Sequence, residues 1–187
     1  MELNGTSAIV TGGASGIGEG AARLLAARGV KVVIADLERQ AEKGEALAKE
    51  IGGAFVPCDV VNAEQVAVAV ATAVEMAPLR SLVNAAGMGS AGRTIDRTGA
   101  PHDLDAYRRV IEINLIGSFN CLRLAASAMN SNVPDVDGGR GAVVNIASVA
   151  AFDGQIGQAA YASSKGGVVS MTLVAARDRA ASASPGR

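Results

Sequence analysis

"TGGASGIG", residues Thr11–Gly18, is the stretch that decides the fold of this chain. It joins the short apolar run Ser7–Thr11 to Gly16–Arg28, where apolar side chains recur with helical spacing. Glycines in such a place permit a tight turn, a close backbone approach and close packing of helix on strand; here they are Gly12, Gly16 and Gly18. Free N–H groups and the positive end of the helix attract a pyrophosphate. The turn predicts dinucleotide binding, although its spacing differs from G-x-G-x-x-G and a purely structural turn is the alternative.

Apolar runs of strand length alternate with longer, alanine-rich segments of helical period along the whole chain. Strands that are apolar throughout and separated by helices form a parallel sheet covered on both faces. The predicted fold class is therefore α/β, a Rossmann-like doubly wound parallel sheet of about five strands. We expect a single domain over residues 1–180 and an irregular tail at 181–187. Ligands of such sheets bind beyond the carboxyl ends of the strands.

The boundaries of the expected elements follow from the same alternation. Strands are expected at Ser7–Thr11, Lys31–Asp36, Ala54–Asp59, Arg80–Gly87 with its turn, and Ala142–Ser148. Helices are expected at Gly16–Arg28, Gln40–Ile51, Ala63–Ala77, from the N-cap Asp103 to about Met129, and in a last segment that ends near Ala180.

The bulk composition excludes several classes of function. The chain has 187 residues and a net charge of −1, which offers no broad basic surface for nucleic acid. Cys58 and Cys121 form no Cys-x-x-Cys pair, so we expect neither a disulfide framework nor a zinc site, and a reducing compartment, by default the cytoplasm. The single histidine, His102, lies in a loop, and we expect no metal or triad role for it. No apolar run reaches the ~20 residues that span a membrane, and we expect no secretory signal before the first strand.

Acidic residues follow the second and third expected strands. Asp36 comes 18 residues after Gly18, the reach at which a carboxylate accepts hydrogen bonds from the hydroxyls of an adenosine ribose. The same carboxylate would repel a 2′-phosphate, so NAD is favoured over NADP. Asp59 and Val60 end the third strand, where the adenine would lie. The alternatives are a solvated strand-end acid for Asp36 and a helix N-cap for Asp59.

Tyr161 and Lys165 are four residues apart, so on a helix they share one face. A free tyrosine has a pKa near ~10 and is a poor base at neutral pH, but a neighbouring ammonium stabilises the phenolate. Ser148 ends the fifth strand 13 residues earlier, where it could hold a developing carbonyl oxygen. Asn114 has poor helix propensity for its interior position and could hold a water that relays the proton. Each residue has an ordinary structural alternative; together they predict a proton-transfer site.

In combination these motifs resemble the short-chain dehydrogenase/reductase family over almost the whole chain. The matching features are "TGGASGIG", Asp36, Asp59-Val60, "NAAG" (Asn84–Gly87), Asn114, Ser148 and "YASSK". The resemblance implies NAD-dependent oxidation of a secondary alcohol. It implies that Asn114, Ser148, Tyr161 and Lys165 are catalytic, with Ser148 and Gln155 contacting substrate. Cofactor contacts implied in the same way are Gly12, Ser15, Gly16, Ile17, Gly18, Asp36, Asp59, Val60, Asn84, Ala85, Gly87, Tyr161 and Lys165.

Two stretches are similar to a narrower group of family members, those that oxidise 3-hydroxyacyl-CoA to 3-oxoacyl-CoA in fatty acid metabolism. They are Val133–Leu173 and the loop from Met88 to His102. A hydroxysteroid or another secondary alcohol is the alternative substrate. The resemblance also implies a homo-oligomer, formed through the long helix before strand five and the helix that carries Tyr161.

The end of the chain departs from the family pattern, which continues with a sixth strand, a Pro-Gly turn, a substrate-covering loop and a seventh strand. Ala181–Ser184 reads Ala-Ser-Ala-Ser where Gly-Ile-Gly-Ile is expected, and a one-base slip in the codons accounts for the difference. We therefore expect a frameshift or sequencing error, which an alternative reading frame downstream would reveal. A chain ending here is expected to expose strand five as a sheet edge and to lose a wall of its substrate pocket. It would then bind NAD weakly with little turnover, and a truncated inactive NAD-binding protein is the third alternative.

Overall fold

The computed structural model describes residues 2–182 and divides into two compact units. Unit 1 comprises the described residues up to Ala86 together with Asn120–Val144. Unit 2 comprises Gly87–Phe119 and the described residues from Asn145 onward. The single domain over residues 1–180 stays a prediction.

Unit 1 is built on a five-stranded sheet with the order β3-β2-β1-β4-β5. The strands are β1 (Ser7–Thr11), β2 (Lys31–Asp36), β3 (Ala54–Pro57), β4 (Leu79–Asn84) and β5 (Ala142–Asn145). β1 pairs in parallel with both β2 and β4, and β2 pairs in parallel with β3. The α/β class and the parallel sheet are thus confirmed. β3 and β5 end earlier than predicted, so Asp59 and Ser148 lie in the segments that follow these strands; Gly87 lies after β4, in the predicted turn.

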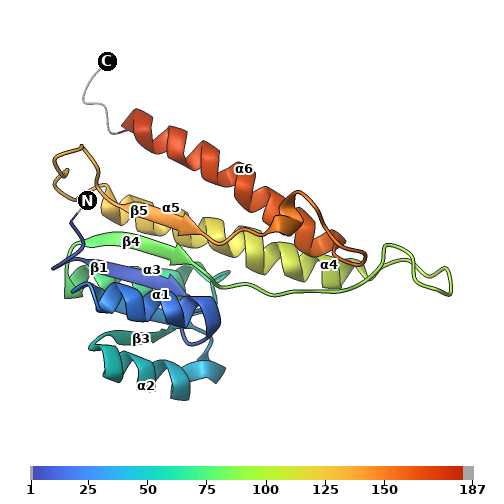
Figure 1. Ribbon diagram of the computed structural model, residues 1–187, viewed down its shortest axis with the longest axis horizontal. Helices are drawn as coiled ribbons and strands as arrows, with labels where there is room; N and C mark the ends of the chain where they lie inside the picture. The colour runs from blue at the N-terminus through green and yellow to red at the C-terminus, as the bar shows by residue number, and fades with distance from the viewer. Residues whose placement is uncertain (1, 183–187) are drawn as a thin grey trace. The chain divides into compact units, whose positions relative to one another are not determined.

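Helices cover both faces of the sheet in unit 1, as predicted. They are α1 (Gly16–Ala26), α2 (Ala41–Ile51), α3 (Ala63–Met76) and most of α5 (Ser118–Met129), with a short 3₁₀ turn η1 (Glu38–Gln40). α1 lies in front of β1, and α3 lies behind it (Figure 1); both helices also contact β2. Because the sheet is covered twice, its central strands are apolar along their length; Val10, Val32, Val33 and Ile34 are fully buried.

Unit 2 is helical in its described part. Its elements are α4 (Leu104–Ile111), a π-helical segment η2 (Glu112–Gly117), the start of α5, a 3₁₀ turn η3 (Val149–Ala151) and α6 (Ala159–Ser182). α6 packs against α4, η2 and η3. A Cβ on Gly167 would lie 2.6 Å from Cδ2 of Leu115, so a small residue on α6 is needed for this close approach to η2.

The helix predicted from Asp103 to Met129 is correct at its start and wrong in its continuity. The Asp103 carboxylate accepts the N–H of Asp105 at 2.9 Å, which confirms the predicted N-cap. The helix is then interrupted by η2, because six residues around Asn114 adopt π-helical hydrogen bonding.

At the other end of the chain, α6 reaches Ser182, so 181–182 are helical rather than irregular. Residues 183–187 of the predicted tail lie outside the described residues.

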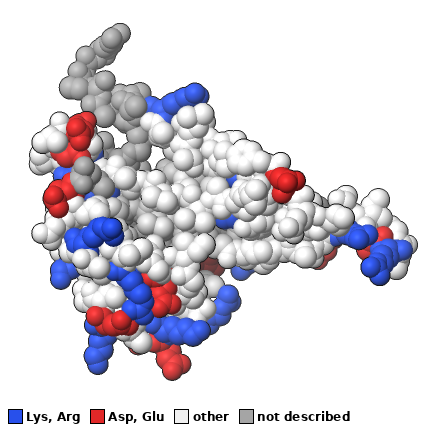
Figure 2. Space-filling view, in the orientation of Figure 1, with Lys and Arg blue, Asp and Glu red and all other residues white. Residues whose placement is uncertain are grey.

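Charged side chains of both signs are interspersed on the surface of unit 1. Figure 2 shows Lys and Arg beside Asp and Glu over α2, whose sequence AEKGEALAKEI alternates the two signs. Within residues 2–182 no helix combines the length and apolarity needed to cross a membrane. In that same range no three His, Cys, Asp or Glu side chains are grouped to hold a metal ion.

Candidate active site

The glycine turn, Thr11–Gly18, connects β1 to α1 in unit 1. Gly12 and Gly16 have φ angles of +61° and +56°, which side chains with a Cβ rarely adopt. A Cβ on Gly18 would lie 2.2 Å from the carbonyl oxygen of Gly12, whereas a Cβ on Gly16 would meet nothing within 4 Å. Gly18 is therefore needed for packing, and Gly16 faces open space. The first N–H groups of α1 have no partner within the helix, as at the start of any α-helix.

The turn that follows β4 packs directly against the glycine turn. The hydroxyl oxygen of Thr11 accepts the N–H groups of Ala85 and Ala86, each at 3.1 Å. A Cβ on Gly12 would lie 2.8 Å from Cα of Ala86. β1 lies between β2 and β4, so this is where the strand order reverses, the place at which doubly wound sheets bind their ligands. Asn84 and Ala85 are thus placed beside the glycine turn, as the sequence predicts.

Asp36 lies at the glycine turn rather than in solvent. Its carboxylate accepts the N–H of Ala14 at 3.0 Å and that of Leu37 at 2.8 Å. The two bonds hold the carboxylate at the carboxyl end of β2, next to the turn. The alternative of a merely solvated strand-end acid is therefore wrong.

Asp59 and Val60 follow β3, the neighbour of β2. Asp59 accepts the N–H of Val61 at 3.2 Å. The N-cap of α3 is Asn62, which accepts the N–H groups of Glu64 and Gln65, so the alternative of Asp59 as that cap is wrong. Val60 is buried, and its carbonyl oxygen accepts the side-chain amide of Asn120 at 2.8 Å.

Asn114 is the centre of a polar network in unit 2. It is 0% exposed and lies in η2. Its amide exchanges two hydrogen bonds with Met88: the Met88 N–H donates to Oδ1 at 2.8 Å, and Nδ2 donates to the Met88 carbonyl at 2.9 Å. Nδ2 also donates to Oγ of Ser164 at 3.0 Å. This explains the helix-interior asparagine, because its side chain holds the loop after β4 to α6. The predicted relay water is not tested by these contacts.

Tyr161 and Lys165 share one face of α6, as their spacing predicts. Nζ of Lys165 lies 5.7 Å from the centre of the Tyr161 ring. It donates to the carbonyl oxygen of Ile146 at 2.6 Å. Lys165 is 6% exposed, and its burial lowers the pKa of the ammonium from its ordinary value of 10.5. The lysine is therefore a held group and not a solvated surface side chain.

Gly87 lies where Asn114 and Lys165 approach each other. A Cβ on Gly87 would lie 3.2 Å from Oδ1 of Asn114 and 3.8 Å from Nζ of Lys165. Gly87 itself is exposed, so these two buried polar groups have an open approach beside them.

Ser148 and Gln155 lie on the segment between β5 and α6. Ser148 is the half-buried N-cap of η3 and accepts the N–H of Ala150 at 3.2 Å. It follows Ile146, the residue that Lys165 binds, by two positions. Gln155 is exposed, and its N–H donates to the side chain of Gln158 at 3.0 Å. We call Asn114, Ser148, Tyr161 and Lys165 the tyrosine cluster.

Sequence reasoning missed two supporting hydroxyls. Thr11 joins the two turns of unit 1, and Ser164 joins Asn114 to α6 by donating to the carbonyl oxygen of Tyr161 at 2.7 Å. The sequence signal for Ser164 is its position three residues after Tyr161, and the structure shows that it is fully buried. The cysteines carry no chemistry here: burial raises the pKa of Cys58 to about 11 and that of Cys121 to about 12, so both remain thiols at neutral pH.

Comparison with known proteins identifies the class. The family model described as short chain dehydrogenase matches residues 6–183, and the chain belongs to this family. It is therefore an oxidoreductase, and the family implies a nicotinamide cofactor.

Individual relatives narrow the comparison. The 3-hydroxyacyl-CoA dehydrogenase type-2 of Drosophila melanogaster is 49% identical over 174 residues, which cover 91% of this chain and 68% of that protein. The Homo sapiens protein of the same name is 44% identical over 182 residues, covering 95% of this chain and 69% of that one. The crystal structure of 3-hydroxyacyl-CoA dehydrogenase type-2 from Mycobacterium avium matches with a TM-score of 0.93 at 43% identity, over 98% of this chain and 73% of that chain.

The residues of unit 1 fit a dinucleotide. Close backbone contacts at Gly12 and Gly18 leave no room for a side chain, whereas a Cβ on Gly16 would meet nothing within 4 Å. Asp36 supplies acceptor oxygens at the adjoining strand end. This combination of a backbone donor surface and a carboxylate suits a pyrophosphate followed by a ribose.

Proposed function

We propose that this protein catalyses the NAD-dependent oxidation of a 3-hydroxyacyl-CoA to the 3-oxoacyl-CoA. The observation that carries the proposal is the placement of buried Lys165, 5.7 Å from the ring of Tyr161 and bonded to the carbonyl of Ile146. A buried lysine bonded in this way keeps its ammonium group on the same face of α6 as Tyr161, where its charge can stabilise a phenolate. The relatives that bear the name 3-hydroxyacyl-CoA dehydrogenase type-2 support the substrate class.

The tyrosine cluster would supply the proton chemistry. Tyr161 takes the hydroxyl proton of the substrate, and Lys165 in its charged form stabilises the phenolate. Ser148 donates to the oxygen that becomes the carbonyl. Asn114 holds the loop after β4 in place and would hold a relay water. The bound nicotinamide supplies the acceptor for the hydride that leaves the same carbon, so a C–H and an O–H bond break as one C=O bond forms.

The choice of NAD over NADP rests on Asp36. Its carboxylate is fixed at the glycine turn by the N–H groups of Ala14 and Leu37. A fixed negative charge there accepts hydrogen bonds from ribose hydroxyls and repels a 2′-phosphate. The remaining cofactor contacts in unit 1 are proposed to be Gly12, Ser15, Gly16, Ile17, Gly18, Asp59, Val60, Asn84 and Ala85; in unit 2 they are Gly87, Tyr161 and Lys165.

A second substrate class is a cyclic secondary alcohol, including hydroxysteroids. Two relatives support this second class by their names. One is a trans-4-hydroxycyclohexanecarboxylate dehydrogenase that is 37% identical to this chain, and the other is a borneol dehydrogenase that is 39% identical. Gln155 is proposed as a polar substrate contact for either class, since it is exposed seven residues after Ser148.

The experiment that tests the function follows the absorbance of reduced nicotinamide. The purified chain is mixed with NAD or NADP and with 3-hydroxybutyryl-CoA, a hydroxysteroid or cyclohexanol. We expect the highest rate with NAD and 3-hydroxybutyryl-CoA. A higher rate with either alternative alcohol would overturn the substrate class, and a preference for NADP would overturn the cofactor.

The cellular setting is part of the same proposal. The two free, buried cysteines are in keeping with a reducing compartment, and we propose the cytoplasm.

We also propose that the protein forms a homo-oligomer. Light scattering of the purified chain tests this proposal, and a monomeric mass would contradict it.

A further inference from the structure

The loop between β4 and α4 is an ordered hairpin anchored at its base. The N–H of His102 donates to the carbonyl of Thr94 at 2.9 Å, and Ile95 and Pro101 form an antiparallel bridge. The Asp96 carboxylate closes the tip by accepting the N–H groups of Thr98 at 2.7 Å and Ala100 at 3.0 Å. Residues 93–101 are all exposed, whereas Gly92 and His102 at the base are half-buried. The contacts of this hairpin with the rest of unit 2 are therefore expected at its base.

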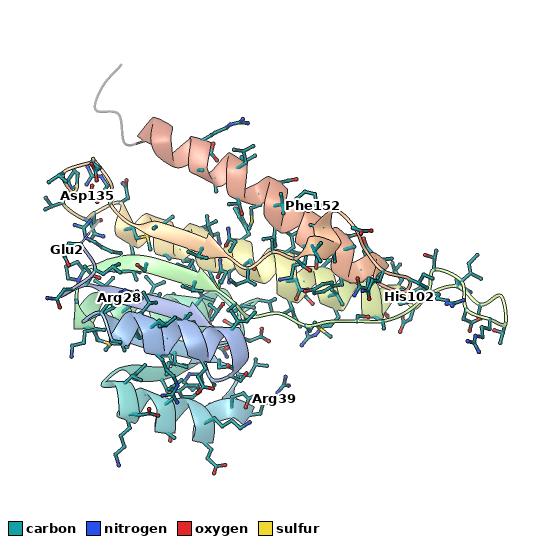
Figure 3. The ribbon with its side chains drawn as sticks, in the orientation of Figure 1. Glu2, Arg28, Arg39, His102, Asp135 and Phe152 are labelled. Atoms are coloured by element: carbon teal, nitrogen blue, oxygen red, sulfur yellow. The ribbon has the colours of Figure 1, made fainter. Side chains whose placement is uncertain are left out.

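At that base the imidazole of His102 occupies the space that a side chain on residue 92 would need. A Cβ on Gly92 would lie 2.2 Å from Cε1 and 2.5 Å from Nδ1 of His102. On its other side, the N–H of Gly92 donates to the carbonyl of Gly157 at 2.8 Å, and Gly92 forms a parallel bridge with Gln158. Gly92 is therefore held between the His102 ring and the segment that leads into α6. Figure 3 shows His102 at the base of this loop.

Gln158 connects this contact to the segment between η3 and α6. Its side-chain oxygen accepts the N–H of Gln155 at 3.0 Å, and its own N–H donates to the Gln155 carbonyl at 3.0 Å. Its carbonyl accepts the N–H of Ala162 at 2.7 Å in the first turn of α6. Ile156 lies within the segment so held, and Phe152 lies just before it; both apolar side chains are largely exposed, at 83% and 81%. Phe152 lies beside α6 in Figure 3.

We infer that His102 is a positioning residue that holds Gly92 against Gly157 and Gln158, and so fixes Gln155, Phe152 and Ile156 against the acyl part of the substrate. The inference rests on the proposed function for the identity of that substrate. The ring of His102 acts by filling space. It should therefore affect the affinity for the substrate and not the rate of the chemical step, which depends on the tyrosine cluster. Apolar side chains that are exposed but fixed bind an acyl chain better than mobile ones, because less conformational entropy is lost on binding.

The first test replaces the ring and measures two independent properties. In His102→Ala we expect the amide hydrogens of Gly92 and Gln155 to exchange with solvent about tenfold faster, because the hairpin base opens more often. The KM for 3-hydroxybutyryl-CoA should rise about fivefold while kcat stays within about twofold, since ground-state holding is lost and the transition-state groups are untouched. Arg97→Ala, at the exposed tip of the same hairpin, is the matched control and should change neither property.

The second test uses the space that the ring occupies. Gly92→Ala should displace the ring and raise KM, whereas Gly89→Ala in the same loop meets nothing within 4 Å and should be neutral. In the double variant Gly92→Ala/His102→Ala the new methyl group has room, so the second substitution should add little to the first. This non-additivity is specific to two groups in contact.

Each outcome supports or overturns the inference. Unchanged amide exchange in His102→Ala, or fully additive effects in the double variant, would overturn it. Faster exchange with an unchanged KM would overturn the role toward substrate. If the unaltered chain oxidises no 3-hydroxyacyl-CoA, the proposed function fails, and the exchange rates still decide whether His102 holds the segment.

Discussion

The glycine turn of unit 1 and the tyrosine cluster of unit 2 are built in opposite ways. The glycine turn is made of backbone, with Gly12 and Gly16 at positive φ and with Gly12 and Gly18 packed closely against neighbouring backbone. The tyrosine cluster is made of side chains, held by Asn114 and Lys165 through bonds to the backbone of Met88 and Ile146. The comparison teaches that binding and chemistry make different demands. At the glycine turn, an added side chain at a closely packed glycine should disturb the backbone. In the tyrosine cluster, the loss of a functional group should disturb the chemistry.

The sharpest test of this difference is a variant that removes one functional group from the tyrosine cluster. Tyr161→Phe should lower the rate of NADH formation about a thousandfold, because the proton acceptor is lost. The affinity for NAD should stay within about twofold, since the glycine turn is unchanged. The rate is expressed relative to the unaltered chain, and calorimetric titration measures binding. Tyr107→Phe, at the only other tyrosine of the sequence, is the control; an equal loss there would show that the effect is not specific to the cluster.

The complementary test adds one carbon to the glycine turn. Gly18→Ala places a methyl group 2.2 Å from the carbonyl oxygen of Gly12. Backbone must shift to make room, so we expect the free energy of unfolding to fall by about 3 kcal/mol. Gly20→Ala in the same helix meets nothing within 4 Å and should stabilise the chain by up to about 1 kcal/mol through helix propensity. Urea denaturation measures both, and equal effects of the two variants would contradict the close-packing role of Gly18.

These two regions were predictable from the sequence to different depths. The glycine spacing and the apolar strands indicated the glycine turn and the sheet, because backbone constraints leave a signature in residue type. Tyr161 and Lys165 were predictable because four residues make one helical turn. Both of these inferences depend on local geometry alone.

Features that depend on hydrogen-bond register or on contacts distant in sequence were not predictable. The π-helical segment Glu112–Gly117 has the same apolar spacing as an ordinary helix, so the sequence predicts a continuous one. The contact of His102 with Gly92 joins two residues at the base of a hairpin loop, and no spacing in the sequence indicates it.

A smaller effect is expected at Asp36, the carboxylate that borders the glycine turn. Asp36→Asn should weaken NAD binding about tenfold and narrow the preference over NADP, because the fixed negative charge is removed. Titrations with each dinucleotide measure this. Glu38→Gln, exposed two residues further on, serves as control. An undiminished preference for NAD in Asp36→Asn would show that another group reads the ribose.

The smallest effect concerns the buried lysine of the tyrosine cluster. Burial lowers the pKa of Lys165 in the folded chain below 10.5, so the unfolded chain binds more protons between the lowered pKa and that value. Stability from this group is therefore fully present above pH 10.5 and is lost as the pH falls through the lowered pKa. Any stability advantage of Lys165→Met over the unaltered chain should accordingly shrink as the pH rises. Urea denaturation at a series of pH values checks this, and a constant difference would mean that the lysine is not desolvated.

The central claim is that the tyrosine cluster removes the proton of a 3-hydroxyacyl-CoA while its hydride goes to a dinucleotide held by the glycine turn. The most direct measurement follows the hydrogen itself, with 3-hydroxybutyryl-CoA deuterated at carbon 3, NAD and the purified chain. Mass spectrometry should find the deuterium in the reduced dinucleotide, in equal amount to the acetoacetyl-CoA formed. Acetoacetyl-CoA formed without deuterium in the dinucleotide would contradict the account. So would the absence of any acetoacetyl-CoA and any deuterated dinucleotide.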